Sequence, residues 1–285
     1  MKLSTFFFLI INLIALLSTK AQTVQEVVEF ADSIFEQGAY AIASKEYNRA
    51  LFFGYDDKDL LSLKIASCYM EMGQVEQAGT FFDRAYRFAS TDSIRNIAIL
   101  GKAYGLLISE DFVLSIAELI NMNENASLEQ QIHFHFLKGI AHYGLKQDSA
   151  SYHEFQQLLV LSDQNDSISE LLNDEFHHVF RYNKRYNPKR AYIMSGLLPG
   201  SGQISVGAYQ EGINSMVLIG GLYLISLRVA LLYSFWDAAV ALFPWVQRFY
   251  IGGMDSSREL AHQKIDAKRY ESYLKIIELT TPIDF

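Results

Sequence analysis

Histidines are the residues of this sequence whose types and spacing come nearest to a metal site. His133, His135 and His142 lie close together, and His177 and His178 form a separate pair. His135 and His142 can share a helix face because they are seven residues apart, but His133 and His135 point in different directions, and no carboxylate stands at a matching spacing. Hydrogen-bonded or solvated histidines are therefore the better interpretation, and we expect no metal site.

Residue patterns for catalysis are missing as well. The sequence has neither a Gly-x-Ser-x-Gly elbow nor a His-Glu-x-x-His pair. The paired acids Asp56-Asp57 and Glu110-Asp111 fall at predicted helix junctions, where carboxylates usually cap helices in contact with water. Cys68 is the only cysteine, which excludes an intramolecular disulfide and a cysteine-based metal cluster. We therefore predict a protein that is not an enzyme and binds no cofactor.

Charge is distributed unevenly along the 285 residues. Residues 22–183 contain 11 Lys and Arg against 24 Asp and Glu, whereas residues 184–285 contain 11 against 8. An acidic body repels phosphates, so we expect no nucleic acid as its partner. Half of the chain is apolar and only 4 residues are proline, a composition that favours helices over disorder.

The first 21 residues have the pattern of an export signal. Lys2 precedes an apolar core, and Thr19-Lys-Ala21 provides a small-x-small cleavage site. We predict a signal peptide over residues 1–21, cleaved to leave Gln22 as the first residue. An uncleaved signal anchor is the alternative, because Lys20 makes the cleavage site imperfect. In both cases the segment that follows is exported.

Residues 22–160 repeat a pattern of small residues about every 36 positions. Ala31, Ala66, Ala103 and Gly139 begin the four copies, at spacings of 35, 37 and 36. The positions 12, 16 and 19 residues further on are Ala43, Tyr47 and Ala50 in the first copy, Ala78, Phe82 and Ala85 in the second, Ser115, Leu119 and Met122 in the third, and Ser151, Phe155 and Leu158 in the fourth. Small residues on both sides of a large one let two antiparallel helices approach closely and receive the next pair.

This pattern and its period resemble the tetratricopeptide repeat. The first two copies match well, and Glu36-Gln-Gly-Ala-Tyr40 and Glu71-Met-Gly-Gln-Val75 supply their inter-helix turns, whereas the third and fourth copies have drifted. The resemblance implies a solenoid of helix pairs whose concave groove binds a peptide or a partner protein. An irregular helical bundle is the alternative fold.

Residues 161–190 are predicted to form a capping helix and a basic linker. The helix runs from Ser167 to Tyr182, and Glu170, Asp174 and Glu175 are expected on a polar outer side that closes the solenoid. The linker Asn183-Lys-Arg-Tyr-Asn-Pro-Lys-Arg190 carries four cations that can meet anionic head groups.

Residues 191–253 are predicted to be embedded in a bilayer, because this stretch is apolar on nearly all sides. A helix break is expected at Leu197-Leu-Pro-Gly-Ser-Gly-Gln203, with the glutamine bonding to freed backbone groups. The span Ile213–Tyr233 then crosses the bilayer, and Ala238–Ile251 returns or re-enters, kinked by proline. A third, broken pass through Met194–Tyr209 is an alternative that would place the C-terminal helix in the cytoplasm.

The motif residues of this hairpin are Pro199, Gly200, Gly202, Gln203, Gly207, Tyr209, Arg228 and Asp237. Their order, Leu-Leu-Pro-Gly-x-Gly-Gln followed by Gly-x-Tyr and a lipophilic helix, resembles a widespread bacterial family of small membrane hairpin domains that are often appended to repeat proteins. Ser205 stands where such domains usually place an aromatic residue. We expect Arg228 to extend its charged end to the interface and Asp237 to lie in an interfacial turn.

A separate amphipathic helix is expected within residues 254–285, after a break at Gly252-Gly253. Its predicted apolar side includes Leu260, Ile265, Tyr270 and Leu274, and its cations suit a membrane surface or docking on the hairpin.

The predicted architecture is therefore all-α: a tetratricopeptide-like helical-repeat solenoid followed by a transmembrane helical hairpin. We expect a non-enzymatic, membrane-tethered scaffold whose exported repeats bind a protein or peptide in the cell envelope. The expected location is the bacterial inner membrane, with the repeats in the periplasm. The alternative function makes the membrane tail itself active, as a channel or lipid-handling element that the repeats regulate.

Overall fold

The computed structural model describes residues 23–123, 125–163 and 166–281, so the predicted signal peptide lies outside the described residues. Throughout the described part of the chain the regular structure is α-helical, with no strand. This confirms the all-α prediction. The chain divides into two compact units, Met1–Ser162 and Asp163–Phe285.

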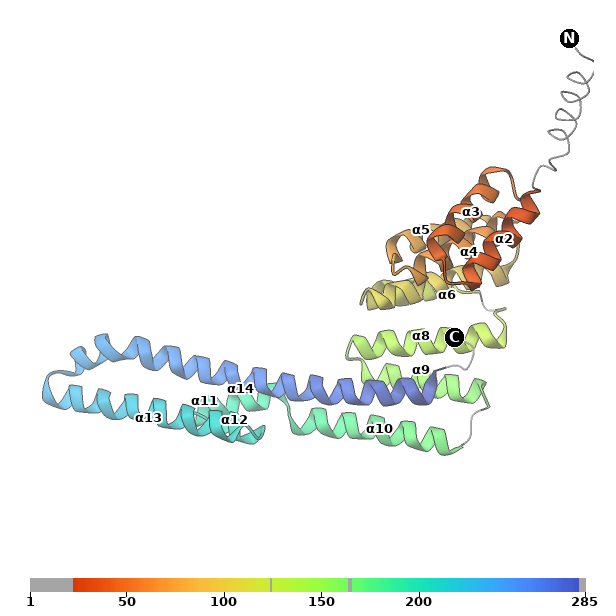
Figure 1. The fold of residues 1–285 in the computed structure, drawn as a ribbon. Coiled ribbons are helices and arrows are strands. Elements are labelled where there is room, and N and C mark those ends of the chain that lie inside the picture. The colour runs from red at the N-terminus through yellow and green to blue at the C-terminus, as the bar shows by residue number, and fades with distance from the viewer. Residues whose placement is uncertain (1–22, 124, 164–165, 282–285) are drawn as a thin grey trace, which may run out of the picture. The chain divides into compact units, whose positions relative to one another are not determined.

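The first unit is a series of helices in which each packs on its neighbours along the chain (Figure 1). They are α2 (Val24–Glu36), α3 (Tyr40–Phe52), α4 (Lys58–Glu71), α5 (Val75–Phe88), α6 (Asp92–Ile108), α7 (Phe112–Leu119), α8 (Leu128–Gly144) and α9 (Asp148–Leu161). Helix α6 also contacts both α4 and α8, the first helices of the preceding and the following pair. Each pair α2–α3, α4–α5, α6–α7 and α8–α9 therefore packs on the next.

The same turn joins the two helices of all four pairs. Its central residue has a positive φ in each case: 76° at Gly38, 69° at Gly73, 61° at Glu110 and 60° at Lys146. The amide of that residue donates to the carbonyl three residues back, and the next amide donates to the carbonyl five residues back, which is the Schellman pattern for ending a helix. These four residues have the same spacing as the small residues that begin the four sequence copies.

The repeated small positions are the contact points between paired helices. All eight signature residues of the first two copies are buried: Ala31, Ala43, Tyr47, Ala50, Ala66, Ala78, Phe82 and Ala85. Two later copies carry serine in place of alanine at the second small position. There Ser115 Oγ donates to the Ala103 carbonyl, and Ser151 Oγ donates to the Gly139 carbonyl, each over 2.9 Å. Serine is nearly as small as alanine, and its hydroxyl is hydrogen-bonded to a backbone carbonyl within the helix contact.

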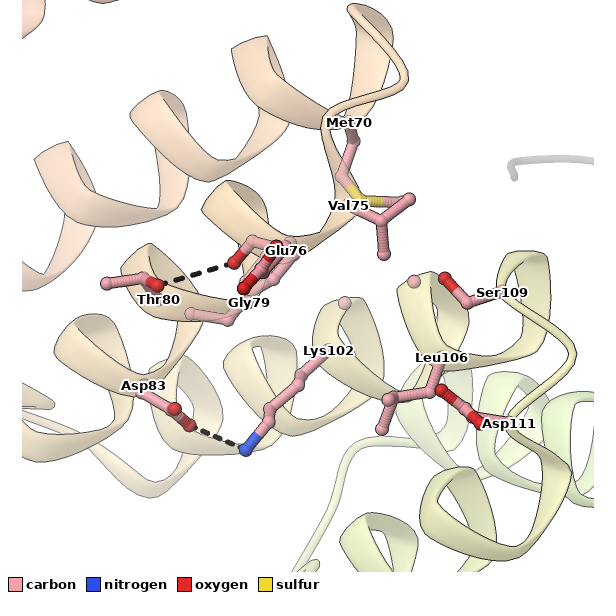
Figure 2. A pocket seen from close by; sticks show the side chains of 13 residues that line it. Met70, Val75, Glu76, Gly79, Thr80, Asp83, Lys102, Leu106, Ser109 and Asp111 are labelled. Carbon is pink, nitrogen blue, oxygen red and sulfur yellow. Dashed lines mark hydrogen bonds and ion pairs between the residues drawn. The ribbon is translucent and has the colours of Figure 1, made fainter.

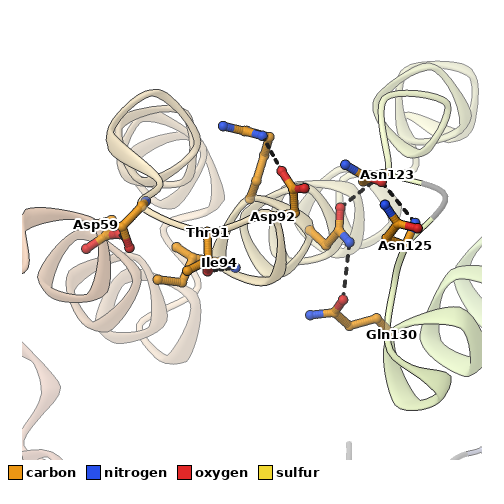
Figure 3. Close-up of polar contacts among 10 residues, drawn as sticks. Asp59, Thr91, Asp92, Ile94, Asn123, Asn125 and Gln130 are labelled. Carbon is orange, nitrogen blue, oxygen red and sulfur yellow. Dashed lines mark hydrogen bonds and ion pairs between the residues drawn. The ribbon is translucent and has the colours of Figure 1, made fainter.

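Buried polar side chains join the second pair to the third and the third pair to the fourth, and these were not predicted (Figure 3). Asp59 on α4 accepts from the amide and hydroxyl of Ser90, over 2.8 and 2.7 Å, in the loop that leads to α6. Asn96 stands at the equivalent position of α6 and accepts from the Asn123 amide over 3.0 Å, in the loop that leads to α8. Asn96 also donates to Gln130 on α8. The Asp59 carboxylate and the Asn96 side-chain amide therefore fix the path of the chain into the pair that follows each of them.

The second unit is organised around one long helix, α14 (Phe235–Thr280), which contacts every other helix described in that unit (Figure 1). The others are α10 (Asp166–Arg185), α11 (Pro188–Leu197), α12 (Ser201–Ser205) and α13 (Tyr209–Leu232). Helices α13 and α14 form a hairpin that turns at Tyr233 and Ser234.

Two predictions for this unit are wrong. The first is the break at Gly252-Gly253, because α14 continues through both glycines and through Pro244. Gly253 serves close packing: a Cβ there would stand 3.0 Å from Ser215 Oγ on α13. The second concerns Glu175, because the other two acids expected on the polar outer side of α10, Glu170 and Asp174, are exposed as predicted. Glu175 is buried against α14, where Ser272 Oγ donates to its carboxylate over 2.9 Å.

The buried side of the C-terminal half of α14 also differs from the predicted apolar side. Tyr270 and Leu274 are exposed, whereas Ser257, Ala261 and Ser272 are fully buried. Small residues at these positions let α14 approach its neighbours closely, and hydrophobicity alone does not identify such a contact.

Candidate functional site

The first candidate site is the elbow between α11 and α13, where the Pro-Gly-Ser-Gly-Gln motif breaks the helix as predicted. Pro199 follows the C-cap of α11, and Gly200 takes a φ of 86°, which an L side chain rarely adopts. A Cβ on Gly200 would stand 2.1 Å from the Gly212 carbonyl oxygen, and one on Gly202 would stand 2.1 Å from the Ala191 carbonyl oxygen. Both glycines are therefore required for the backbones to approach.

Gln203 connects this elbow to the long helix. Its side chain is 2% exposed. Its Oε1 accepts from Ser195 Oγ over 2.8 Å, and its Nε2 donates to the Gly253 carbonyl of α14 over 2.8 Å. Ser195 Oγ in turn accepts from the Gly202 amide over 3.1 Å. The glutamine therefore bonds to the partner helix, while the serine, which was not singled out in the sequence, bonds to the amide at the break.

Gly207 and Tyr209 stand where the elbow passes into α13. Gly207 has a φ of 79°, and a Cβ there would stand 3.1 Å from Lys264 Nζ on α14. Tyr209 is the first residue of α13, and its ring is exposed. The elbow therefore places one cation of α14 next to the start of α13.

Arg228 and Asp237 are not brought into the elbow. Both are exposed, Arg228 near the end of α13 and Asp237 in the first turn of α14. Asp237 is thus helical and does not lie in the turn itself, which is a correction to the prediction. A carboxylate in a first turn is favourable because the helix N-terminus is partially positive.

Helix α13 has the length and composition of a membrane-crossing segment, and it is the one such helix found within the described residues. Its 24 residues have a mean hydropathy of 2.0 over the most apolar stretch, of which 6% is buried. At 1.5 Å per residue it is about 36 Å long, compared with about 30 Å for the hydrocarbon core of a bilayer. Its apolar side chains, among them Val217, Leu224 and Leu231, are exposed.

The second candidate site is a cavity of about 310 Å³ between α5 and α6 (Figure 2). Three glycines line it, Gly79 on α5 and Gly101 and Gly105 on α6. A Cβ on Gly79 would have no other atom within 4 Å, so this glycine faces open space. A volume near 300 Å³ is the lower end of the range for ligand pockets, which suits a single side chain or a short peptide segment.

The charges around this cavity are mainly negative. Glu76, Asp83 and Asp111 line it together with one cation, Lys102. Lys102 bonds to Asp83 over 2.8 Å and to Glu118 over 2.7 Å. Burial opposes its charge, but these two carboxylates outweigh burial and raise the pKa of Lys102. Lys102 is thus paired with Asp83 and Glu118. Asp111, at the N-cap of α7, makes no side-chain capping hydrogen bond.

A smaller cavity continues the same groove towards α7. It shares Phe82, Asp83 and Lys102 with the first cavity and adds Glu118 and Asn121. The groove therefore runs along α6, on the helix that packs against both the preceding and the following pair.

Among the residues considered for chemistry, His135 belongs to a cluster of charged side chains and Cys68 to the core of the first unit. His135 Nδ1 lies 2.8 Å from Glu154 Oε2, and Lys138 Nζ lies 2.9 Å from the other carboxylate oxygen. Burial opposes the charge of Glu154, but these two hydrogen bonds lower its pKa to about 2. Cys68 is fully buried, and burial raises the pKa of its thiol to about 11. Within the described residues no group of His, Cys, Asp and Glu could hold a metal ion.

No protein-family model and no curated protein sequence matches this chain.

Proposed function

We propose that this protein is a non-enzymatic, membrane-tethered scaffold. In this proposal the first unit is a tetratricopeptide-like solenoid that is exported and binds a protein or peptide partner. The α13–α14 hairpin holds it at the bacterial inner membrane, with the repeats in the periplasm. The single observation that carries partner binding is the glycine-lined cavity between α5 and α6.

The repeated turns and contacts support the solenoid. The four helix pairs share the same Schellman turn between their two helices and the same small positions for their internal contact. Buried polar groups fix the chain at two of the junctions between pairs. Pairs built in this way are units that stack. Stacked pairs produce an extended surface, on which repeat proteins bind their partners.

The chemistry of the cavity supports a peptide as its occupant. Backbone atoms of Gly79, Gly101 and Gly105 border it, so a partner segment can approach closely. The carboxylates of Glu76 and Asp111 lie at its edge without a cation on either in the described residues. A segment with a basic residue complements these charges.

Photo-crosslinking tests the proposed binding groove. Benzoylphenylalanine at Thr80, an exposed residue of the cavity, is expected to give a discrete adduct in intact cells. Gly79→Leu adds a side chain to the cavity at a position where a Cβ would have no other atom within 4 Å, and it is expected to abolish that adduct. Gln77→Leu, a change on the exposed side of α5 away from the cavity, is the matched control and is expected to retain it. An adduct that survives Gly79→Leu, or no adduct at Thr80, would overturn partner binding at this groove.

A further inference from the structure

We propose that the base of the α13–α14 hairpin is a binding surface for the phosphate groups of anionic lipids, centred on Tyr186. The proposal rests on the membrane insertion of α13 and is independent of partner binding at the α5–α6 groove. The observations behind it are two cations, from α10 and α14, beside one aromatic ring, two further cations at the start of the neighbouring α11, the lack of ion pairs to these four within the described residues, and the position of Lys264 at the end of the spanning helix.

Cations far apart in the sequence meet around one aromatic ring. The Arg185 guanidinium, at the end of α10, lies 5.4 Å from the centre of the Tyr186 ring. The Lys264 ammonium, on α14, lies 5.6 Å from the same centre. Lys189 and Arg190 follow at the start of α11, which packs on α14. The ring attracts both cations and orders their charged ends.

These four cations have no ion-pair partner among the described residues, in contrast to other cations of α14. Arg258 lies 2.7 Å from Asp255, and Lys268 lies 3.2 Å from Glu271. No such pair is formed by Arg185, Lys189, Arg190 or Lys264 in residues 166–281.

The two α11 cations also stand at the unfavourable end of their helix. Pro188 is the first residue of α11, so Lys189 and Arg190 lie in its first turn, where the helix dipole is positive. An anion placed there would bond to these side chains and offset both the repulsion among the cations and their conflict with the dipole.

The position of the surface indicates that the anion belongs to a lipid. Lys264 Nζ approaches to within 3.1 Å of the place that a Cβ of Gly207 would take, and α13 begins two residues later. The cations therefore lie at the end of a helix about 36 Å long, and hydrocarbon fills about 30 Å of that length. The phosphates of the head groups lie at this boundary. Leu197 and Leu198, at the end of α11, are exposed and continue the apolar surface up to it.

Gly207 gains a specific role from this arrangement. Its φ of 79° permits the turn, and a Cβ there would make a tight contact of 3.1 Å with Lys264 Nζ. The glycine of the Gly-Ala-Tyr segment is thus required for the turn into α13, and a side chain there would crowd the cation.

Lipid binding to the full-length protein in a neutral detergent tests the proposal. Phosphatidylglycerol and phosphatidylcholine are added separately, and bound lipid is counted by native mass spectrometry while Tm is followed. Wild-type protein is expected to retain phosphatidylglycerol and rise in Tm, with little response to phosphatidylcholine. Each Lys or Arg near an anionic surface contributes about a factor of five to affinity, so Arg185→Gln with Lys264→Gln is expected to weaken binding about thirtyfold.

The control removes the same charge from neighbouring paired cations. Arg258→Gln with Lys268→Gln is expected to leave phosphatidylglycerol binding nearly unchanged, because those side chains already bond to acids. Equal losses in the two double variants, or equal retention of both lipids, would overturn the site. Glycerol phosphate is the soluble probe, and a Tm rise with it would assign the surface to a free phosphate and overturn the lipid. Release of the protein from vesicles by alkaline carbonate would instead refute membrane insertion, which is a separate result.

Discussion

The four Schellman turns allow a test in which two pairs of substitutions change stability in opposite directions. Gly38 and Gly73 have positive φ, and a Cβ on either would have no other atom within 4 Å. Glu110 and Lys146 hold the same conformation with side chains. Apart from the side-chain interactions of Lys146, backbone strain and unfolded-state flexibility are therefore what distinguish glycine from other residues at these turns.

The size of the effect follows from these two terms. The left-handed conformation costs a residue with a side chain about 1 to 2 kcal/mol, and the flexibility of glycine in the unfolded chain offsets about 0.5 to 1 kcal/mol of that cost. Glu110→Gly and Lys146→Gly are therefore expected to raise the free energy of unfolding by about 0.5 to 1 kcal/mol each. Gly38→Ala and Gly73→Ala are expected to lower it by about the same amount.

Cys68 provides the assay, because it is the only cysteine of the chain and is fully buried in the first unit. Brief maleimide labelling of the full-length protein across a urea series reports the unfolding of that unit alone. Stabilisation by Gly38→Ala, or destabilisation by Glu110→Gly, would refute the common turn geometry and with it the structural equivalence of the four pairs.

Three further substitutions test particular contacts. Gln203→Leu removes the link between the elbow and α14 and is expected to destabilise the second unit by about 2 kcal/mol, measured as a lower melting temperature in detergent, whereas the exposed control Gln210→Leu is expected to have little effect. Glu154→Gln is expected to cost about 2 to 3 kcal/mol near neutral pH. Because the pKa of Glu154 is lowered from 4.5 to about 2 in the folded protein, this stabilisation is present above pH 4.5 and lost as the pH falls towards 2, so urea titrations of variant and wild type should converge there. Ser115→Ala is expected to cost about 1 kcal/mol or less, because it removes one hydrogen bond without changing the contact of small residues; a loss above about 3 kcal/mol would contradict this role.

The helical pairs of the first unit were predictable because their signal is periodic. Ala31, Ala66 and their equivalents mark helix contacts at fixed offsets, and all eight signature residues of the first two copies are buried. The buried polar links were not predictable, because Asp59 and Asn96 are different residue types at one repeat position and their partners lie in loops of different length. A sequence pattern of small and large residues carries no information about such buried polar links.

In the second unit a local break was predictable, whereas the long-range packing was not. The break at Pro199-Gly200 follows from the conformations that these two residue types favour, and it was predicted. The continuous course of α14 was not predicted, because glycine and proline usually end a helix in water. A helix can continue through them where tertiary packing or a bilayer supports it. Gly253 illustrates this, since its missing side chain is used for contact with α13. The bond from Gln203 to the same residue spans fifty positions and leaves no local pattern.

Protease accessibility of two tags tests the proposed topology most directly. One tag is placed after Gln22 and the other after Phe285, and spheroplasts are treated with protease before and after lysis. The membrane-tethered scaffold, with an exported first unit and a hairpin of α13 and α14, predicts that both tags are cut in intact spheroplasts. Cutting of the first tag alone would contradict the hairpin, because it requires an odd number of crossings. Protection of both tags until lysis would contradict export of the repeats.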